Sequence, residues 1–396
     1  MQVSRRLSNI HAGGGSGWEL FYRARAMKLA GVSVVDLTQG EPDIPTDPLI
    51  LEAMDAAARA GYTGYSPIEG DPDLRDAVAA RIAARTQVAT SRAHVIISAG
   101  AQAALFAAHH LALDEGDVGL YIDPHYATYP GTIRGVGGVP CAVQVRPSDG
   151  FQPQAEALAQ AAKGAKSLLV NAPNNPTGVV YDAATWDGIA AVCQAQDLWL
   201  ISDEVYDGQV WQGAHLSPRS LPGMAERTLV IGSMSKSHAM TGSRCGWVCA
   251  VPDVIRHLSA LASNSTYGVA WFVQRAALAG LHAGTALENK VAAPFKRRRD
   301  ITLRLLAEQT VLEAVTPQGG MYVMLDIRPT GLSGEAFGAA LLDAEHIAVM
   351  PGESFGAAAA GHIRIAMTAA DDVYADAVQR ILRFAKERID GNTTAR

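Results

Sequence analysis

The stretch Thr228-Leu-Val-Ile-Gly232, followed at once by Ser233-Met-Ser-Lys236, indicates how this chain folds. An apolar run of this length predicts a strand that is buried on both faces, as in a parallel sheet covered by helices. The strand ends at two hydroxyl groups and an amine, with Arg244 eight residues further on. Burial and a neighbouring cation can lower a lysine pKa enough for Schiff-base chemistry. Most lysines, however, are surface residues, and the tetrapeptide alone also fits an ordinary loop lysine.

Similar runs recur through the first three quarters of the chain and alternate with helical stretches. They cover residues 94–98, 118–122, 139–145, 166–170 and 198–202. Repeated strand–helix units predict an α/β fold with a mainly parallel sheet covered by helices. Helices are also expected at residues 18–30, 48–60 and 72–85, and residues 1–17, which are polar and then glycine-rich, are expected to form a flexible arm.

Beyond residue 284 the pattern changes to that of a smaller α+β domain. It predicts a long helix over 294–309, a strand with alternating faces over 320–326 and a helix from Ser333. Strands near 347–350 and 362–366 and a terminal helix from Asp371 follow. We therefore expect an N-terminal arm with part of the small domain (1–46), a large cofactor-binding domain (47–284) and a small C-terminal domain (285–396).

Composition excludes several classes of protein. The chain has 396 residues, 48% of them hydrophobic and 18% charged, and a net charge of −6 with dispersed basic residues, so nothing indicates a nucleic-acid partner. Residues 95–113 carry no formal charge but contain Ser98, Gly100, Gln102 and two histidines, which fits a strand, turn and helix better than a membrane span. The four cysteines form no Cys-x-x-Cys pair and no metal-like cluster, and the N-terminus lacks the apolar core of a signal peptide. We expect a cytoplasmic protein without a metal.

Polar groups follow four more of the predicted strands. Ala99-Gly-Ala-Gln102 could seat a phosphate at a helix N-terminus, and Tyr126 could stack on a flat ligand. Asn171-Ala-Pro-Asn-Asn175-Pro-Thr-Gly178 fixes amides in a rigid turn, and Asp203-Glu-Val-Tyr206 adds an acid and a phenol. Taken singly, each has an ordinary reading as a helix cap or a packed loop residue. Because ligands bind outside the carboxyl ends of parallel strands, the set together predicts a planar cofactor with a phosphate, a ring nitrogen and an aldehyde.

With these motifs in place, the chain resembles the class I aminotransferases of the pyridoxal-phosphate-dependent, fold-type-I superfamily. The likeness runs from Gly40-Glu-Pro-Asp43 to Arg364. It rests on Asn175-Pro-Thr-Gly178, Asp203-Glu-Val-Tyr206, Ser233-x-Ser-Lys236 and Gly242-x-Arg244-x-Gly246 in the family's order and spacing. Ala172 and Ser243 depart from it, at positions where the family often has serine and tryptophan.

By that resemblance, Lys236 would hold pyridoxal 5'-phosphate as a Schiff base and move a proton between substrate and cofactor. Asp203 would pair with the pyridine nitrogen, Tyr206 and Asn175 would bond the phenolic oxygen, and Tyr126 would stack on the ring. Arg364, Gly40 and Asn175 would bind the substrate, with Arg364 gripping its α-carboxylate. Tyr65 of the partner subunit would reach the phosphate, so the active unit would be a homodimer. The other phosphate contacts would be Gly100, Ala101, Gln102, Ser233, Ser235 and Arg244.

The resemblance implies that an α-amino group passes from an L-amino acid to a 2-oxo acid, such as pyruvate or 2-oxoglutarate, by a ping-pong mechanism. Stretches including residues 197–203, 216–227 and 324–333 look like those of bacterial arginine–pyruvate aminotransferases, which makes arginine or another basic amino acid the donor hypothesis. The candidate acids for its side chain are Glu19, Glu69 and Asp71. Alternatives are an aspartate or aromatic aminotransferase, a β-eliminating lyase on the same fold and a non-catalytic regulatory module. A nicotinamide-dependent dehydrogenase is disfavoured, since no Gly-x-Gly-x-x-Gly follows a strand.

Overall fold

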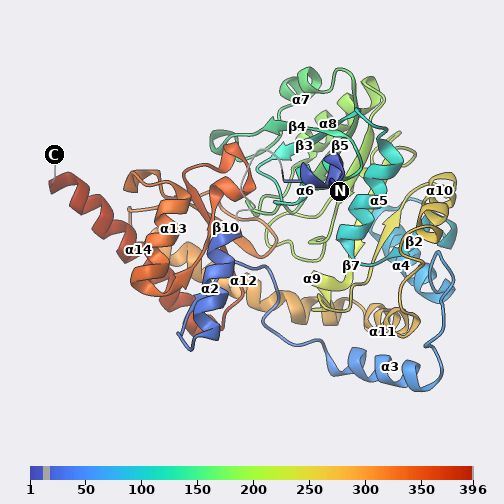
Figure 1. Ribbon diagram of the computed structural model, residues 1–396, viewed down its shortest axis with the longest axis horizontal. Coiled ribbons are helices and arrows are strands. Elements are labelled where there is room, and N and C mark those ends of the chain that lie inside the picture. The colour runs from blue at the N-terminus through green and yellow to red at the C-terminus, as the bar shows by residue number, and fades with distance from the viewer. Residues whose placement is uncertain (12–17, 395–396) are drawn as a thin grey trace.

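A seven-stranded sheet forms the centre of the larger part of the molecule, on the right in Figure 1. The computed structural model describes residues 1–11 and 18–394, so the glycine-rich part of the expected arm, 13–17, lies outside the described residues, whereas its first part contains the short helix α1 (Arg5–Ser8). All neighbouring strands pair in parallel except at β8, which is antiparallel to both β2 and β7. The prediction of a mainly parallel sheet is therefore confirmed. In spatial order the strands are β2 (Val95–Ser98), β8 (Gly246–Cys249), β7 (Thr228–Ser233), β6 (Trp199–Asp203), β5 (Ala165–Asn171), β3 (Val118–Asp123) and β4 (Val139–Gln144).

Helices cover both faces of this sheet because most strands bury side chains on both sides. One face packs against α5 (Ala101–Ala112), α6 (Tyr129–Gly135) and α10 (Pro252–Ser263). The opposite face is covered by α4 (Pro72–Thr86), α8 (Ala183–Ala195) and α11 (Trp271–His282), with α3 (Pro48–Arg59) and α7 (Ala155–Ala161) further out. Neighbouring residues of β6 show the division, since Leu200 packs on one side and Ile201 on the other.

A smaller sheet forms the centre of the second part, on the left in Figure 1, and all its strand pairs are antiparallel. Its order is β12 (Met350–Pro351), β13 (His362–Ala366), β10 (Tyr322–Asp326) and β9 (Glu313–Ala314). The helices beside it are α12 (Thr285–Ala307), α13 (Gly334–Glu345), α14 (Asp371–Thr394) and the N-terminal α2 (Glu19–Leu29). In addition, β1 (Val35–Asp36) pairs in parallel with β11 (Ile347–Ala348).

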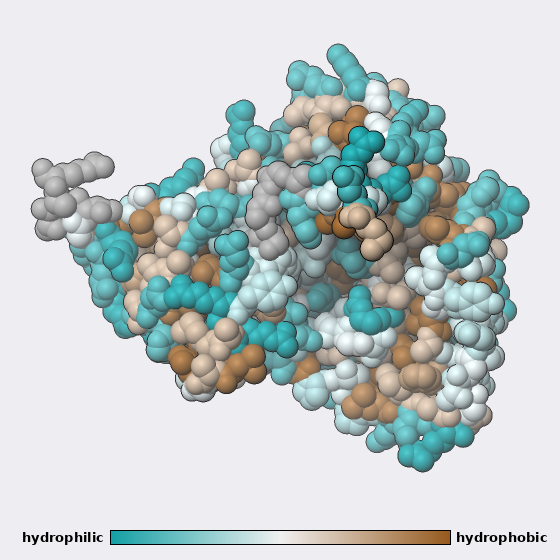
Figure 2. Space-filling model, in the orientation of Figure 1, coloured by the Kyte–Doolittle hydropathy of each residue, from teal (hydrophilic) through white to brown (hydrophobic). Residues whose placement is uncertain are grey.

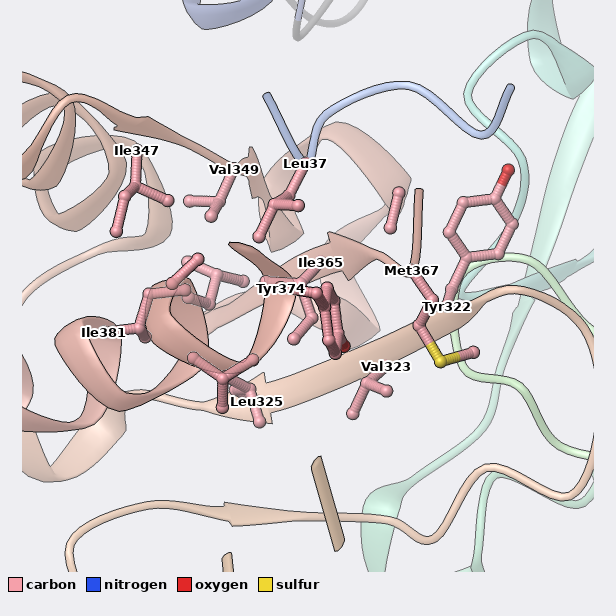
Figure 3. Close-up of a cluster of buried hydrophobic side chains, with 14 of the residues drawn as sticks. Leu37, Tyr322, Val323, Leu325, Ile347, Val349, Ile365, Met367, Tyr374 and Ile381 are labelled. Atoms are coloured by element: carbon pink, nitrogen blue, oxygen red, sulfur yellow. The ribbon is translucent and has the colours of Figure 1, made fainter. Parts of the chain in front are cut away.

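One hydrophobic cluster holds this second part together. Figure 3 shows Leu325, Ile365 and Tyr374 meeting between strand and helix, while Leu37 joins them from the N-terminal segment. Tyr322 lies at the edge of the cluster with its hydroxyl directed away from the aliphatic side chains. The small sheet therefore supplies a polar group at the boundary with the larger part.

Three details differ from the expectations. Helix α12 begins at Thr285, not Pro294, and carries Pro294 inside, where proline removes one helical hydrogen bond without ending the helix. Residues 347–350 divide between β11 and β12, which belong to different sheets. Strand β10 does not alternate, because residues 322–325 are buried on both faces.

Figure 2 shows one face of the molecular surface. Hydrophilic residues cover most of the face in Figure 2, and hydrophobic ones lie in small separate groups. Over the described part of the chain, no helix is long and apolar enough to cross a membrane. All four cysteines are free thiols.

Candidate active site

A cavity of about 380 Å³ lies at the carboxyl ends of the parallel strands, and the small sheet contributes to its wall. It brings together side chains whose positions span most of the sequence. The predicted site residues that line it are Gly40, Ala101, Gln102, Tyr126, Asn175, Asp203, Tyr206, Ser233, Ser235, Lys236, Arg244 and Arg364. Gly100 lies just behind this wall, and Tyr65 does not line it.

Lys236 sits on the single-turn helix α9 (Met234–Ser237), which begins where β7 ends. Its Nζ donates a hydrogen bond to the backbone oxygen of Gly40. Burial lowers the pKa of Lys236, an effect that Tyr322 and Glu41 partly oppose. A lower pKa increases the neutral, nucleophilic fraction of the amine.

The two serines beside Lys236 fix the turn between strand and helix. Ser233 caps α9 by accepting a hydrogen bond from the Ser235 backbone nitrogen at 3.0 Å. The Ser233 hydroxyl also donates to the Ser235 hydroxyl at 2.9 Å. Both hydroxyls line the cavity.

Asp203 ends β6 and is almost wholly buried. Tyr129 donates a hydrogen bond to its Oδ2 at 2.6 Å, and the Val205 nitrogen donates to Oδ1 at 3.3 Å. Burial nevertheless raises the pKa of Asp203 to about 6. A cation bound nearby would stabilise the charged form of such a buried carboxylate. Asp203 lines the cavity, so a cation in the cavity could do this.

Tyr206 and Tyr322 join the two parts of the molecule across the cavity. Their hydroxyl groups lie 3.1 Å apart, and burial raises the pKa of Tyr206 well above its ordinary value. A Cβ atom on residue 40 would lie only 1.7 Å from the Tyr322 hydroxyl, so this position requires glycine. The close approach brings the Gly40 backbone to the wall of the cavity.

Arg364 is a buried cation without an acidic partner among the described residues. Its Nη1 donates to Asn175 Oδ1 at 3.0 Å and its Nη2 donates to the Thr38 oxygen, while Nε has no hydrogen-bond partner. The guanidinium carbon lies 4.3 Å from the Tyr322 ring centre and 4.4 Å from that of Phe355. These contacts fix the plane of the fork and leave donor capacity for a carboxylate.

The N-terminus of α5 faces Arg244 at another part of the wall. Gly100 is the cap residue, has a φ of 81°, and no side chain caps the helix. A Cβ atom on Gly100 would lie 2.3 Å from Arg244 Nη2, and one on Gly246 would lie 3.0 Å from the Ala101 nitrogen. Arg244 forms no ion pair with a described residue and donates only to the Thr241 oxygen, at 2.7 Å. Backbone N–H groups and a free guanidinium thus meet where an anion could bind.

Several lining residues were assigned no role in the sequence analysis, although Glu41, Asn171, Val205 and Gly242 stand within the motifs quoted there. The lining residues without an assigned role are Trp18, Thr38, Gln39, Glu41, Leu105, Tyr129, Asn171, Val205, Thr241, Gly242 and Tyr322. Tyr129 comes three residues after Tyr126, and a search for polar residues after each strand could have included it. Tyr322 carries no such signal, because it lies inside a strand of the other sheet.

Two of the acids considered for substrate recognition have structural contacts instead. Glu69 accepts a hydrogen bond from Ser259 at 2.6 Å. Asp71 caps α4 and accepts hydrogen bonds from Trp271 and Arg275. Neither lines the cavity, and neither does Glu19.

The chain is similar to known proteins over almost its whole length. Residues 32–381 match the family model described as aminotransferase class I and II. The arginine–pyruvate transaminase of Pseudomonas aeruginosa is 39% identical over 98% of this chain and 99% of that protein. The aspartate/prephenate aminotransferase of Thermus thermophilus is 34% identical over 91% of this chain and 93% of that protein.

Solved structures show the same likeness in three dimensions. The aspartate aminotransferase from Thermus thermophilus with maleate superposes with a TM-score of 0.90 at 32% identity. The match covers 97% of this chain and 100% of that one. The aromatic aminotransferase from Pyrococcus horikoshii superposes with a TM-score of 0.86 at 31% identity, over 92% of this chain and 99% of that one.

Proposed function

The chain belongs to the class I and II aminotransferases and is a pyridoxal-phosphate-dependent transaminase, and we propose that its amino donor is an L-amino acid with a basic side chain. The acceptor would be a 2-oxo acid such as pyruvate or 2-oxoglutarate, in a ping-pong reaction. The observation that carries the proposed site is the meeting of Lys236, Asp203 and Arg364 in one cavity.

The residues of the cavity fit the cofactor and an amino acid. Among the described residues, buried Asp203 has no cationic partner within ion-pair distance and the Nε of Arg364 has no hydrogen-bond partner. A protonated ring nitrogen would satisfy Asp203, and a substrate carboxylate would satisfy Arg364. The phosphate would be held by the N-terminus of α5, with Gly100, Ala101 and Gln102, together with Ser233, Ser235 and Arg244.

Pyridoxal phosphate supplies an aldehyde that carries the amino group and a ring that accepts electrons from the substrate Cα. Lys236 is proposed to hold the cofactor and, once free, to take the proton from Cα as a general base. Its contact with Gly40 keeps Nζ near the segment that would lie against the substrate. Tyr206 and Asn175 would orient the ring through its phenolic oxygen, and Tyr126 would cover one of its faces.

The charges around the cavity support a basic rather than an acidic donor. Its described lining contains three cations, Lys236, Arg244 and Arg364, and each already has a proposed task. The lining acids are Asp203 and Glu41, and Glu41 is held by the Thr241 hydroxyl at 2.7 Å. The name of the Pseudomonas relative points to the same class of donor.

We expect arginine and lysine to be better donors than aspartate and phenylalanine when each is paired with pyruvate. Glu41→Gln should lower kcat/KM for arginine about fivefold and leave phenylalanine nearly unchanged, because a partly exposed ion pair contributes up to about 1 kcal/mol. Glu19→Gln is the matched control, since Glu19 is exposed and lies outside the lining. Equal rates for all four donors would contradict the proposal.

We also propose that the active unit is a homodimer to which Tyr65 of the partner subunit contributes a phosphate contact. Tyr65 and Tyr267 support this, since their rings pack 5.1 Å apart while both remain largely exposed. A homodimer should appear in sedimentation of the cofactor-loaded protein, and Tyr65→Phe should weaken cofactor binding. The proposed domain limits are residues 46/47 and 284/285, the second of which coincides with the start of α12.

A further inference from the structure

The segment 203–207 presents its residues to two opposite sides. Asp203 and Tyr206 face the active-site cavity. Glu204 and Asp207 instead border a small internal cavity behind the segment, together with Arg81 and Arg85. The residues proposed to contact the cofactor ring are thus attached, within five positions, to two buried carboxylates on the other side.

Asp207 is held by two arginines of α4. Arg81 contacts both of its oxygens, at 2.5 Å and 3.0 Å, and Arg85 contacts Oδ2 at 2.5 Å. Both arginines also contact Glu288 of α12, Arg81 at 3.2 Å and Arg85 at 2.8 Å. Burial alone would raise the pKa of Asp207, but the two guanidinium groups hold it well below the ordinary value. Asp207 is therefore a fixed anion in a four-membered charge network.

Glu204 has its own set of partners. Its Oε1 accepts hydrogen bonds from Ser202 at 2.9 Å and Ser217 at 2.7 Å. Its Oε2 lies 2.9 Å from His215 Nε2. Although burial lowers the pKa of His215, the hydrogen bond and charge of Glu204 raise it above the ordinary value.

These six residues, Arg81, Arg85, Glu204, Asp207, His215 and Glu288, form what we call the rear cluster. Three carboxylates face two guanidinium groups and the His215 imidazole, which balances the third carboxylate when it carries a proton. Such a balance suits a buried site, because removing one member leaves an uncompensated charge that costs several kcal/mol. Packing around it is tight, since a Cβ atom on Gly208 would lie 2.9 Å from Glu288 Oε2.

Building on the proposed function, we propose that the rear cluster positions Asp203 and Tyr206 against the cofactor ring. Asp207 and Glu204 fix the segment 203–207 from behind at two points, through their contacts with Arg81, Arg85, Ser202, Ser217 and His215. The cluster also ties this segment to α4 and to α12, the helix that begins the second part of the molecule. Its members are positioning residues, because they act through Asp203 and Tyr206 and do not line the active-site cavity.

Asp207→Asn tests this proposal through the visible absorption of the cofactor-loaded protein, titrated against pH. We expect the pH midpoint of this absorption change to shift by at least about half a pH unit. The reason is that Asp203 and Tyr206 are proposed to set the midpoint through their contacts with the cofactor ring. Cofactor affinity should fall about tenfold, the lower end of what is seen when the outer supports of metal ligands are removed. Arg85→Gln should act in the same direction with a smaller effect, because Arg85 is the more exposed of the two arginines.

Glu345→Gln is the matched control. Glu345 lies between Arg380 and Arg383, as Asp207 lies between two arginines, but in the other part of the molecule. It should lower the melting temperature without changing the absorption midpoint or the affinity. If Asp207→Asn keeps the wild-type absorption midpoint and cofactor affinity, the rear cluster is purely structural and the proposal is wrong. Should Asp207→Asn fail to fold, the same result for Arg85→Gln would overturn the proposal. A wild-type protein without a visible band would instead contradict the proposed function itself.

Discussion

Lys236→Ala is expected to reduce turnover at least about 10³-fold, because it removes both the attachment point of the cofactor and the proposed general base. The fold should survive. The Lys236 amine donates one hydrogen bond, to Gly40, and forms no ion pair within the described chain, so its loss leaves no buried charge alone. Steady-state rates with the preferred donor measure the first effect, and circular dichroism with thermal unfolding measures the second.

The control for this substitution is Lys290→Ala. Lys290 is an exposed lysine that pairs with Asp47 at 2.7 Å and does not line the cavity. It should keep wild-type turnover. Unimpaired turnover in Lys236→Ala would refute the assignment of this lysine.

Asp203→Asn is expected to lower kcat by about 10²- to 10⁴-fold. Breaking a buried ion pair by removing one partner costs about 3–5 kcal/mol, and each 1.36 kcal/mol corresponds to a factor of ten. An amide cannot neutralise a protonated ring nitrogen, so the ring would lose its capacity to accept electrons. Single-turnover rates with a saturating donor measure this step without the contribution of product release.

The same substitution should stabilise the cofactor-free protein at neutral pH. The pKa of Asp203 is raised to about 6 by burial, so the folded state binds its proton more tightly than the unfolded state, whose value is near 3.8. Stability is then greatest below the unfolded value and falls as the pH rises through the folded one, by up to about 3 kcal/mol. Asparagine does not ionise and can still accept the Tyr129 hydrogen bond.

Thermal unfolding at pH 5 and pH 8 measures this effect. The gain of Asp203→Asn over the wild type should be larger at pH 8. A loss of stability at pH 8, with or without lost activity, would mean that the Asp203 carboxylate is not penalised by its surroundings. If Asp203→Asn loses activity but gains stability, then Asp203 serves the function of the protein at a cost to the stability of its fold.

The part of the site at the strand ends was predictable because of one physical rule. Apolar runs buried on both faces predict β5, β6 and β7, and the polar residue that ends each strand must then lie at one edge of the sheet. Asn171, Asp203 and Ser233 follow directly from this. Strand β8 was not predicted, since Gly246–Cys249 is short, begins with glycine and is antiparallel to its neighbours, unlike the repeated parallel strand–helix units.

Contacts between the two parts of the molecule could not be predicted from local pattern. Tyr322 meets Tyr206 from another sheet, and a strand buried on both faces gives no sign of which side chain reaches the boundary. The partners of Glu69 and Asp71 likewise come from residues almost two hundred positions away. Their structural contacts became apparent only with the fold. Recognition of the donor's side chain depends on such long-range surfaces, which is why the sequence analysis assigned no role to Glu41 and Trp18.

The most direct test of the central claim is reduction of the cofactor-loaded protein with borohydride, followed by mass spectrometry of its peptides. A yellow protein should lose its colour, and the mass of one reduced pyridoxyl phosphate should appear on the peptide that contains Lys236. The cavity supports this expectation, because Lys236 is the lysine that lines it within the described residues. A protein that stays colourless with excess pyridoxal phosphate, or that carries the label on another lysine, would contradict the account.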